Sequence, residues 1–220
     1  MIARFVATLA LAAVAAVEVQ SQPAQTYDLP ARFGNETRRE LTRVIDSARA
    51  EGVPTSPLVA KSAEGVLKNA DDARIVRAVR TLATELRTAR TLMPADASPS
   101  ILMAAASALH AGASRDALSR LAAARSASRG ETDLAVALVT LADLQASRIP
   151  ADAAALAVEA LLRRGVSEQE YAEFRTAVGR DVAAGRPPEA ALTGRLGEIT
   201  RRPVSPPSSS PPRRFESPRQ

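Results

Sequence analysis

The chain of 220 residues suits one domain with tails, and its 46% hydrophobic residues, with 47 alanines against six aromatic side chains, favour closely packed helices over strands. Cysteine is absent, which excludes disulfides, thiol catalysis and cysteine-ligated zinc. Of the formal net charge of +5, residues 201–220 carry +4 (five arginines and one glutamate), so the rest of the chain is near neutral and specific nucleic-acid binding is not expected.

The first 21 residues have the pattern of a secretory signal peptide. One positive charge, at Arg4, precedes an apolar run of 13 residues (5–17). Small residues fit a cleavage site after Ala16 or after Ser21. Thirteen apolar residues are too few to cross about 30 Å of hydrocarbon comfortably, and no later segment spans a membrane without charges. The sequence therefore predicts cleavage and a periplasmic or secreted protein.

Helix punctuation fills the middle of the chain. Residues 22–34 contain two prolines and a glycine and are predicted to be a linker. From 35 to 199, capping residues alternate with Gly, Asn or Pro stops, which predicts about eight helices. Their expected starts are Asn35, Ser56-Pro57, Asp71 or Asp72, Ser98-Pro99, Ser114, Thr132, Pro150, Ser167 and, for a short last helix, Pro188. Their expected stops are Gly52, Asn69, Pro94, Gly112, a point near Gly130, Gly165 and Gly185.

Two of these segments carry strong local patterns. The segment from residue 72 to 93 has one narrow apolar seam, in which the spacing alternates between four and three residues. The seam consists of Ile75, Val79, Leu82, Leu86, Ala89 and Met93. Ser167 and Glu170 form a capping box, in which each side chain accepts a hydrogen bond from a free backbone N–H.

The order of segments suggests imperfect repetition. Residues 63–68 resemble residues 158–163, and helix openings recur at intervals of about 45 to 52 residues. The predicted fold is therefore an all-α domain over 35–199, either a short α-solenoid of helical hairpins or a bundle of non-repeated helices. Residues 200–220, rich in Pro, Ser and Arg, are predicted to be a disordered tail because they offer too little apolar surface to offset ordering.

One stretch carries a family resemblance. The pattern consists of Gly52-Val53-Pro54, Leu58, Lys61, Glu64-Gly65, Lys68 and Ile75. It resembles uncharacterised exported helical proteins of Gram-negative, high-GC bacteria, in which a Gly-x-Pro turn leads into a helix ending in Glu-Gly-x-x-Lys. The resemblance covers about residues 50–92, with Asn69 where Gly is expected. It implies the helical fold and export, and it implies no activity.

The candidate binding residues lie in this same stretch. Lys61, Glu64 and Lys68 are spaced i, i+3 and i+7, so they share one helix face. They are interpreted either as a contact patch for a partner carboxylate or glycan, or as a surface ion-pair ladder. The chain has no other lysine. His110, the single histidine, is interpreted as a helix-terminal residue rather than as a base or ligand.

Catalytic motifs are not found. The sequence lacks a Gly-rich phosphate loop, a Gly-x-Ser-x-Gly elbow and a His-Glu-x-x-His pair, so no enzyme, cofactor or metal is expected. One alternative is a glycosidase with Glu64 and Glu159, which needs its carboxylates about 5 to 10 Å apart. Equivalent positions in two repeats would explain both residues equally well.

The expected function is thus a non-catalytic interaction or scaffold module of the cell envelope. Its partner is expected to be an envelope protein or an anionic polymer, and its oligomeric state is not predicted. The tail adds four candidate contacts: Arg201, Arg202, Arg213 and Arg214. The alternatives are an envelope enzyme acting on glycans through carboxylates, and an anionic-polymer binder acting through this tail.

Overall fold

A computed structural model describes residues 26–125 and 131–201, and within these ranges the chain forms nine α-helices and no strand. The helices are α1 (Asn35–Ala50), α2 (Ser56–Leu67), α3 (Asp72–Leu92), α4 (Pro99–His110), α5 (Arg115–Ala124), α6 (Glu131–Ala146), α7 (Ala151–Arg164), α8 (Glu168–Ala183) and α9 (Pro188–Arg201). The all-α prediction is confirmed. The predicted signal peptide and nearly all of the predicted tail lie outside the described residues.

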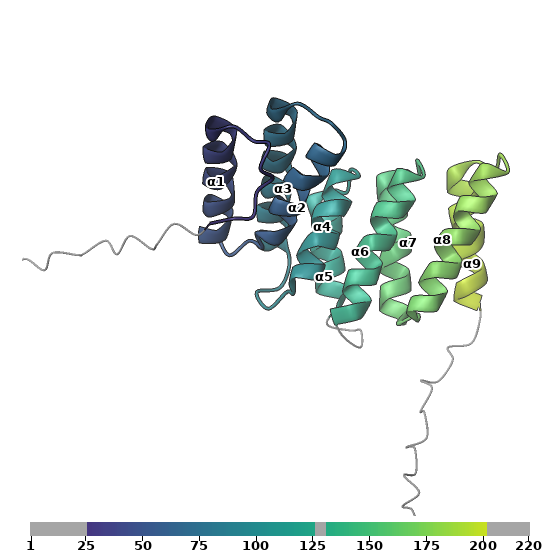
Figure 1. Ribbon diagram of the computed structural model, residues 1–220. Coiled ribbons are helices and arrows are strands. Elements are labelled where there is room, and N and C mark those ends of the chain that lie inside the picture. The colour runs from purple at the N-terminus through teal and green to yellow at the C-terminus, as the bar shows by residue number, and fades with distance from the viewer. Residues whose placement is uncertain (1–25, 126–130, 202–220) are drawn as a thin grey trace, which may run out of the picture.

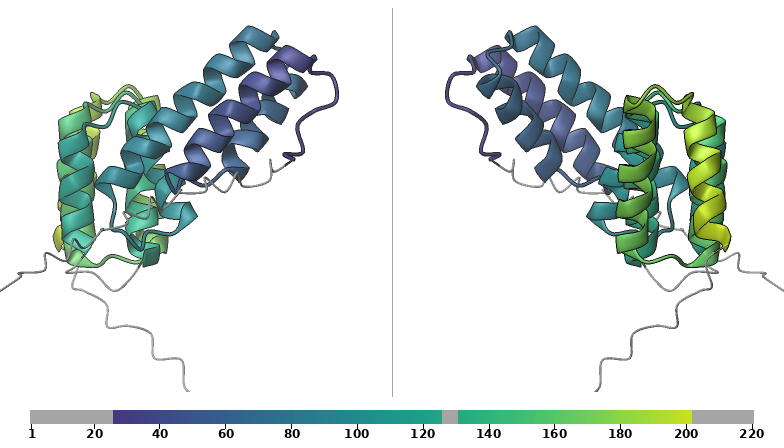
Figure 2. Two further views of the ribbon diagram at one scale, coloured as in Figure 1. Left: turned by 90° about the vertical axis from the view of Figure 1, so that its left-hand side faces the viewer. Right: turned by 90° about the vertical axis from the view of Figure 1, so that its right-hand side faces the viewer.

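The helices form two groups (Figure 1). In the first group, α1 and α2 both pack on the long helix α3. In the second, helices stack in two rows, α4–α6–α8 and α5–α7–α9, and the hairpins α6–α7 and α8–α9 join the rows. The two groups meet where α3 packs on α4, and Figure 2 shows α1–α3 inclined to the helices of the rows.

Most predicted helix ends are confirmed. Asp71 and Ser114 each accept a hydrogen bond from a backbone N–H three residues on, and the capping box of Ser167 and Glu170 is present. The predicted stops Gly52, Gly112, Gly165 and Gly185 all have positive φ, the conformation that ends many helices. Asn69, a predicted stop that is not a glycine, also has a positive φ of 54°.

Four ends differ from the prediction. Asn35 and Ser56 are the first residues of α1 and α2 rather than their caps, positions that Gly34 and Thr55 occupy. Helix α5 ends at Ala124, well before Gly130. Helix α6 already includes Thr132, because it begins at Glu131. Local capping signals therefore indicate these starts only to within one or two residues.

The described part of the segment expected as a linker, residues 26–34, is irregular and packs on the domain. Leu29 and Phe33 are buried in the core. The hydroxyl of Tyr27 donates to Asp46 of α1 at 2.7 Å, and the guanidinium of Arg38 donates to two backbone carbonyls of the segment. Residues 26–34 thus belong to the α1–α3 group.

The seam of α3 is buried with one informative exception. Ile75, Val79, Leu86 and Ala89 lie in the core, whereas Leu82 is only half-buried. Leu82 lies at the edge of the seam, on a side of α3 that neither α2 nor α4 covers. An apolar residue on a helix can therefore face a groove as well as the core.

The lengths and hydropathy of the helices show whether one of them could span a membrane. Among the residues that the structure describes, no helix is both long enough and apolar enough to cross a bilayer.

Candidate functional site: a groove between α2, α3 and α4

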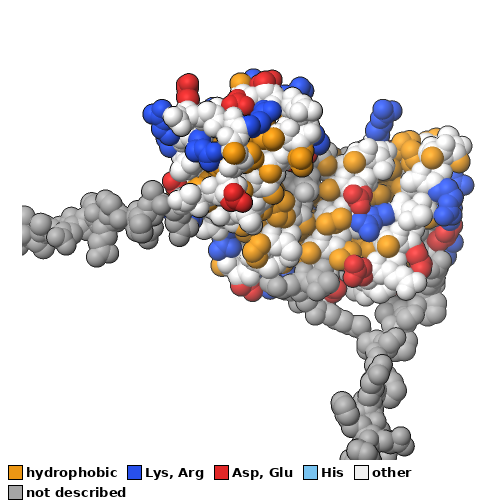
Figure 3. Space-filling view, viewed as in Figure 1, with side chains coloured by type: hydrophobic (Ala, Val, Ile, Leu, Met, Phe, Trp, Pro, Cys, Tyr) orange, Lys and Arg blue, Asp and Glu red, His pale blue; other side chains and the backbone are white. Residues whose placement is uncertain are grey.

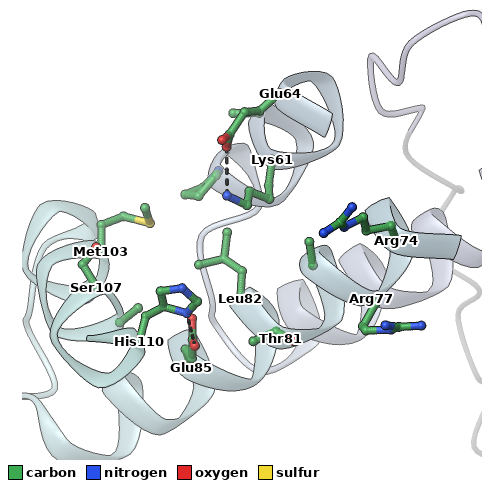
Figure 4. Close-up of a pocket in the computed structure, with 14 residues that line it drawn as sticks. Lys61, Glu64, Arg74, Arg77, Thr81, Leu82, Glu85, Met103, Ser107 and His110 are labelled. Carbon is green, nitrogen blue, oxygen red and sulfur yellow. Dashed lines mark hydrogen bonds and ion pairs between the residues drawn. The ribbon is translucent and has the colours of Figure 1, made fainter. Parts of the chain in front are cut away.

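A groove of about 710 Å³ is lined by one face each of α2 (residues 57–64), α3 (74–85) and α4 (103–110). We refer to it as the α2–α4 groove. It arises because α2 and α4 each pack on α3 at different places, which leaves a stripe of α3 between them uncovered. Figure 4 shows the three helices around the groove.

The floor of the groove is apolar. Leu82 of α3 and Met103 of α4 are half-buried there, and Ala78 and Ala106 provide short side chains between the helices. Figure 4 shows Leu82 projecting toward the centre of the groove. An apolar floor that is open to solvent is the usual character of a binding surface, because its burial by a partner is favourable.

The α2 rim contains two of the predicted binding residues. Lys61 Nζ donates to Glu64 Oε2 at 2.9 Å, and Lys68 Nζ donates to Glu64 Oε1. Hydrogen bonds from Lys68 and Lys61 lower the pKa of Glu64 to about 2. Lys61 and Glu64 line the groove, whereas Lys68 lies outside the lining, with 71% of its side chain exposed. The predicted ion-pair ladder is present, and it borders a groove.

The α4 rim contains an interaction that sequence reasoning missed. His110 is the last residue of α4, as its interpretation as a helix-terminal histidine requires, and its Nδ1 lies 2.9 Å from Glu85 Oε1 of α3. The imidazole is 74% exposed and the Glu85 side chain only 18%. The two residues are 25 positions apart, so only the packing of α4 on α3 brings them together.

Two arginines complete the α3 wall. Neither the Arg74 nor the Arg77 side chain forms an ion pair with a carboxylate among the described residues. In Figure 4 the guanidinium of Arg74 points into the groove, and that of Arg77 points away from it. The sequence alone did not distinguish either residue, because α3 contains five arginines spread along its length.

Glu64 and Glu159, the pair considered for glycoside hydrolysis, are not brought together. Glu159 is buried on α7, where Arg120 of α5 and Arg163 hold it at 3.2 Å and 2.6 Å. Glu64 borders the groove on α2. The two similar stretches, residues 63–68 and 158–163, do not occupy equivalent places. The first lies at the end of α2, the first helix of the pair α2–α3, and the second lies in α7, the second helix of the hairpin α6–α7.

Other candidate ligands are scattered. No group of three or more His, Cys, Asp or Glu residues within 26–125 and 131–201 is arranged to hold a metal ion. Arg201 is the exposed last residue of α9, and Arg202, Arg213 and Arg214 lie outside the described residues. On the face shown in Figure 3, Lys and Arg side chains gather at the α1–α3 end, with apolar side chains exposed between that end and the rows.

In comparisons with known proteins, no family, no curated protein and no solved structure matches this chain. The resemblance to exported helical proteins therefore remains a prediction.

Proposed function

We propose that the protein is a non-catalytic interaction module of the cell envelope, and that the α2–α4 groove is the surface that binds its partner. The observation that carries this proposal is the apolar floor formed by Leu82 and Met103, open to solvent and bordered by charged side chains. A protein partner would bury this floor and pair with the charges at its rim, as in most protein interfaces.

The carboxylates of the groove support binding over catalysis. A general acid works best when its pKa lies near the operating pH. Glu64, with a pKa of about 2, stays ionised at neutral pH because two lysines donate to it. Glu85 is held by His110, and each acid is thus engaged in an ion pair or hydrogen bond with a neighbour. These are properties of a charged rim rather than of a proton donor.

The signal-peptide pattern of residues 1–21 supports action outside the cytoplasm. A basic residue, 13 apolar residues and small residues at two cleavage positions are the features that direct export. The partner is therefore proposed to be a periplasmic or secreted protein, or the periplasmic part of a membrane protein.

Site-specific crosslinking in the native host tests this function. A photo-crosslinking amino acid replaces Met103 in the floor, or Leu156, which is 61% exposed on α7 and serves as the matched control. We expect one reproducible crosslinked protein in the periplasmic or culture fraction from position 103, none from position 156, and less product when Leu82→Glu is added. A product from both positions, or from neither, would contradict the proposal.

A further inference from the structure

The uncovered stripe of α3 has the dimensions of a short helix. Arg74, Ala78, Leu82 and Glu85 are spaced at four, four and three residues, so they follow one another along one side of α3. At 1.5 Å per residue, this stripe is about 17 Å long, or three helical turns. An occupant laid along it would contact α3 below and the flanks of α2 and α4 on either side.

The floor of the groove favours an amphipathic helix as the bound segment. Ala78 and Ala106 leave room for large side chains from the occupant, and the half-buried Met103 offers a flexible, polarizable surface. A helix that presents apolar residues at i, i+4 and i+7 would place one side chain at each turn of the stripe, which is the usual way in which a groove recognises a helix.

The free charge in the groove is positive. Glu64 accepts from Lys61 and Lys68, and Glu85 is joined to His110. Arg74, by contrast, points into the groove without a carboxylate partner among the described residues, with Arg77 one turn farther along α3. Charge complementarity across interfaces therefore calls for a carboxylate on the occupant, near the end that lies against Arg74.

We infer that the α2–α4 groove binds an acidic amphipathic helix of a partner protein, with its apolar side on Leu82 and Met103 and a carboxylate paired to Arg74. This inference rests on the interaction role proposed above and adds the chemical class of the partner.

Selection from a random library of displayed 16-residue peptides, made on the purified protein, tests the inference. We expect the enriched peptides to carry apolar residues at helical spacing and an excess of Asp and Glu toward one end. Their affinity should fall at least tenfold for Arg74→Glu and stay within twofold for Arg115→Glu, which reverses an exposed arginine outside the groove. Arg74→Glu places an acid in the first turn of α3, where it favours the helix, so the variant should fold.

A charge exchange makes the test stricter. An enriched peptide whose acidic end is changed to lysine should lose its affinity for the original protein and regain it with Arg74→Glu. Enrichment of neutral, basic or non-periodic peptides, enrichment of none, or equal affinity for the two Arg→Glu variants would overturn the inference. If position 103 still crosslinks a partner in the host, the interaction role survives and only the chemistry of the partner is wrong.

Discussion

The hydroxyl of Tyr171 lies in the core without a hydrogen-bond partner among the described residues, and the residue is 1% exposed. Burial, together with the nearby charge of Asp133, raises its pKa above the ordinary value of 10.0. A buried polar group without a partner costs about 1 to 3 kcal/mol, so this hydroxyl weakens the fold.

The change Tyr171→Phe should therefore raise the free energy of unfolding at neutral pH, by about 1 kcal/mol. The folded protein holds the phenol proton more tightly than the unfolded chain does, so the stability of the original protein should also fall as the pH rises above 10.0. The Phe variant has no phenol at this position and should not lose stability in this way. Tyr27 is present in both proteins, so it affects their stability equally. Urea unfolding at pH 7 and above pH 10 measures both effects, and a less stable variant at both pH values would contradict the argument.

Residue patterns predicted the buried face of α3 except at Leu82, which is half-buried, and at Ala83, which is buried but lies outside the predicted seam. The reason for the exception at Leu82 is general. Periodicity shows which side of a helix is apolar, but it does not show whether a neighbouring helix covers that side. Leu82 fits the seam and yet faces the groove. The partners His110 and Glu85 were likewise beyond sequence reasoning, because their contact depends on the angle at which α4 packs on α3.

At the scale of the element, Gly65 lets α2 and α3 pack closely at Ile75. A Cβ added at this glycine would lie 2.6 Å from Cγ1 of Ile75 on α3, so the Ile75 side chain packs directly against the glycine. This close approach gives a physical reason for glycine in the Glu64-Gly65 motif. It also positions Lys61 and Glu64 at the rim of the groove.

The change Gly65→Ala should destabilise the protein. Alanine gains up to about 1 kcal/mol of helix propensity over glycine, but overpacking against Ile75 costs about 1 to 3 kcal/mol, so a net loss of about 1 kcal/mol is expected. Gly179→Ala in α8 is the matched control, since its added Cβ meets nothing within 4 Å and only the propensity gain remains. Urea midpoints should move in opposite directions for the two variants; a shift of both toward higher urea would refute the packing argument.

Helix boundaries were predictable because their signals are local. Asp71, Ser114, Ser167 and the glycine stops act through hydrogen bonds and φ angles within a few residues. The rows α4–α6–α8 and α5–α7–α9 depend instead on contacts between distant segments. A weak sequence echo therefore pointed to Glu64 and Glu159 as equivalents, although one borders a groove and the other is buried.

At the scale of the whole molecule, the groove exists because the α1–α3 group is inclined to the rows where α3 meets α4 (Figure 2). Residues 26–34 help to hold that group together through Leu29, Phe33 and the bond from Tyr27 to Asp46. Both predicted cleavage positions, after Ala16 and after Ser21, precede this segment. Removal of the residues before either position would leave the described contacts of residues 26–34 intact.

A truncation series tests this reading of the N-terminal segment. A chain that begins at Thr26 should unfold at the same urea concentration as one that begins at Gln22, because both keep every contact that residues 26–34 form in the described structure. A chain that begins at Asn35 should unfold at a lower urea concentration, since it lacks the burial of Leu29 and Phe33, which contributes about 1.5 to 3 kcal/mol each, and the hydrogen bond from Tyr27 to Asp46. The double change Leu29→Ser and Phe33→Ser in the longer chain should reproduce most of this decrease, which separates side-chain burial from the mere length of the chain. Equal midpoints for the chains that begin at Thr26 and Asn35 would show that the segment only lies on the domain without stabilising it.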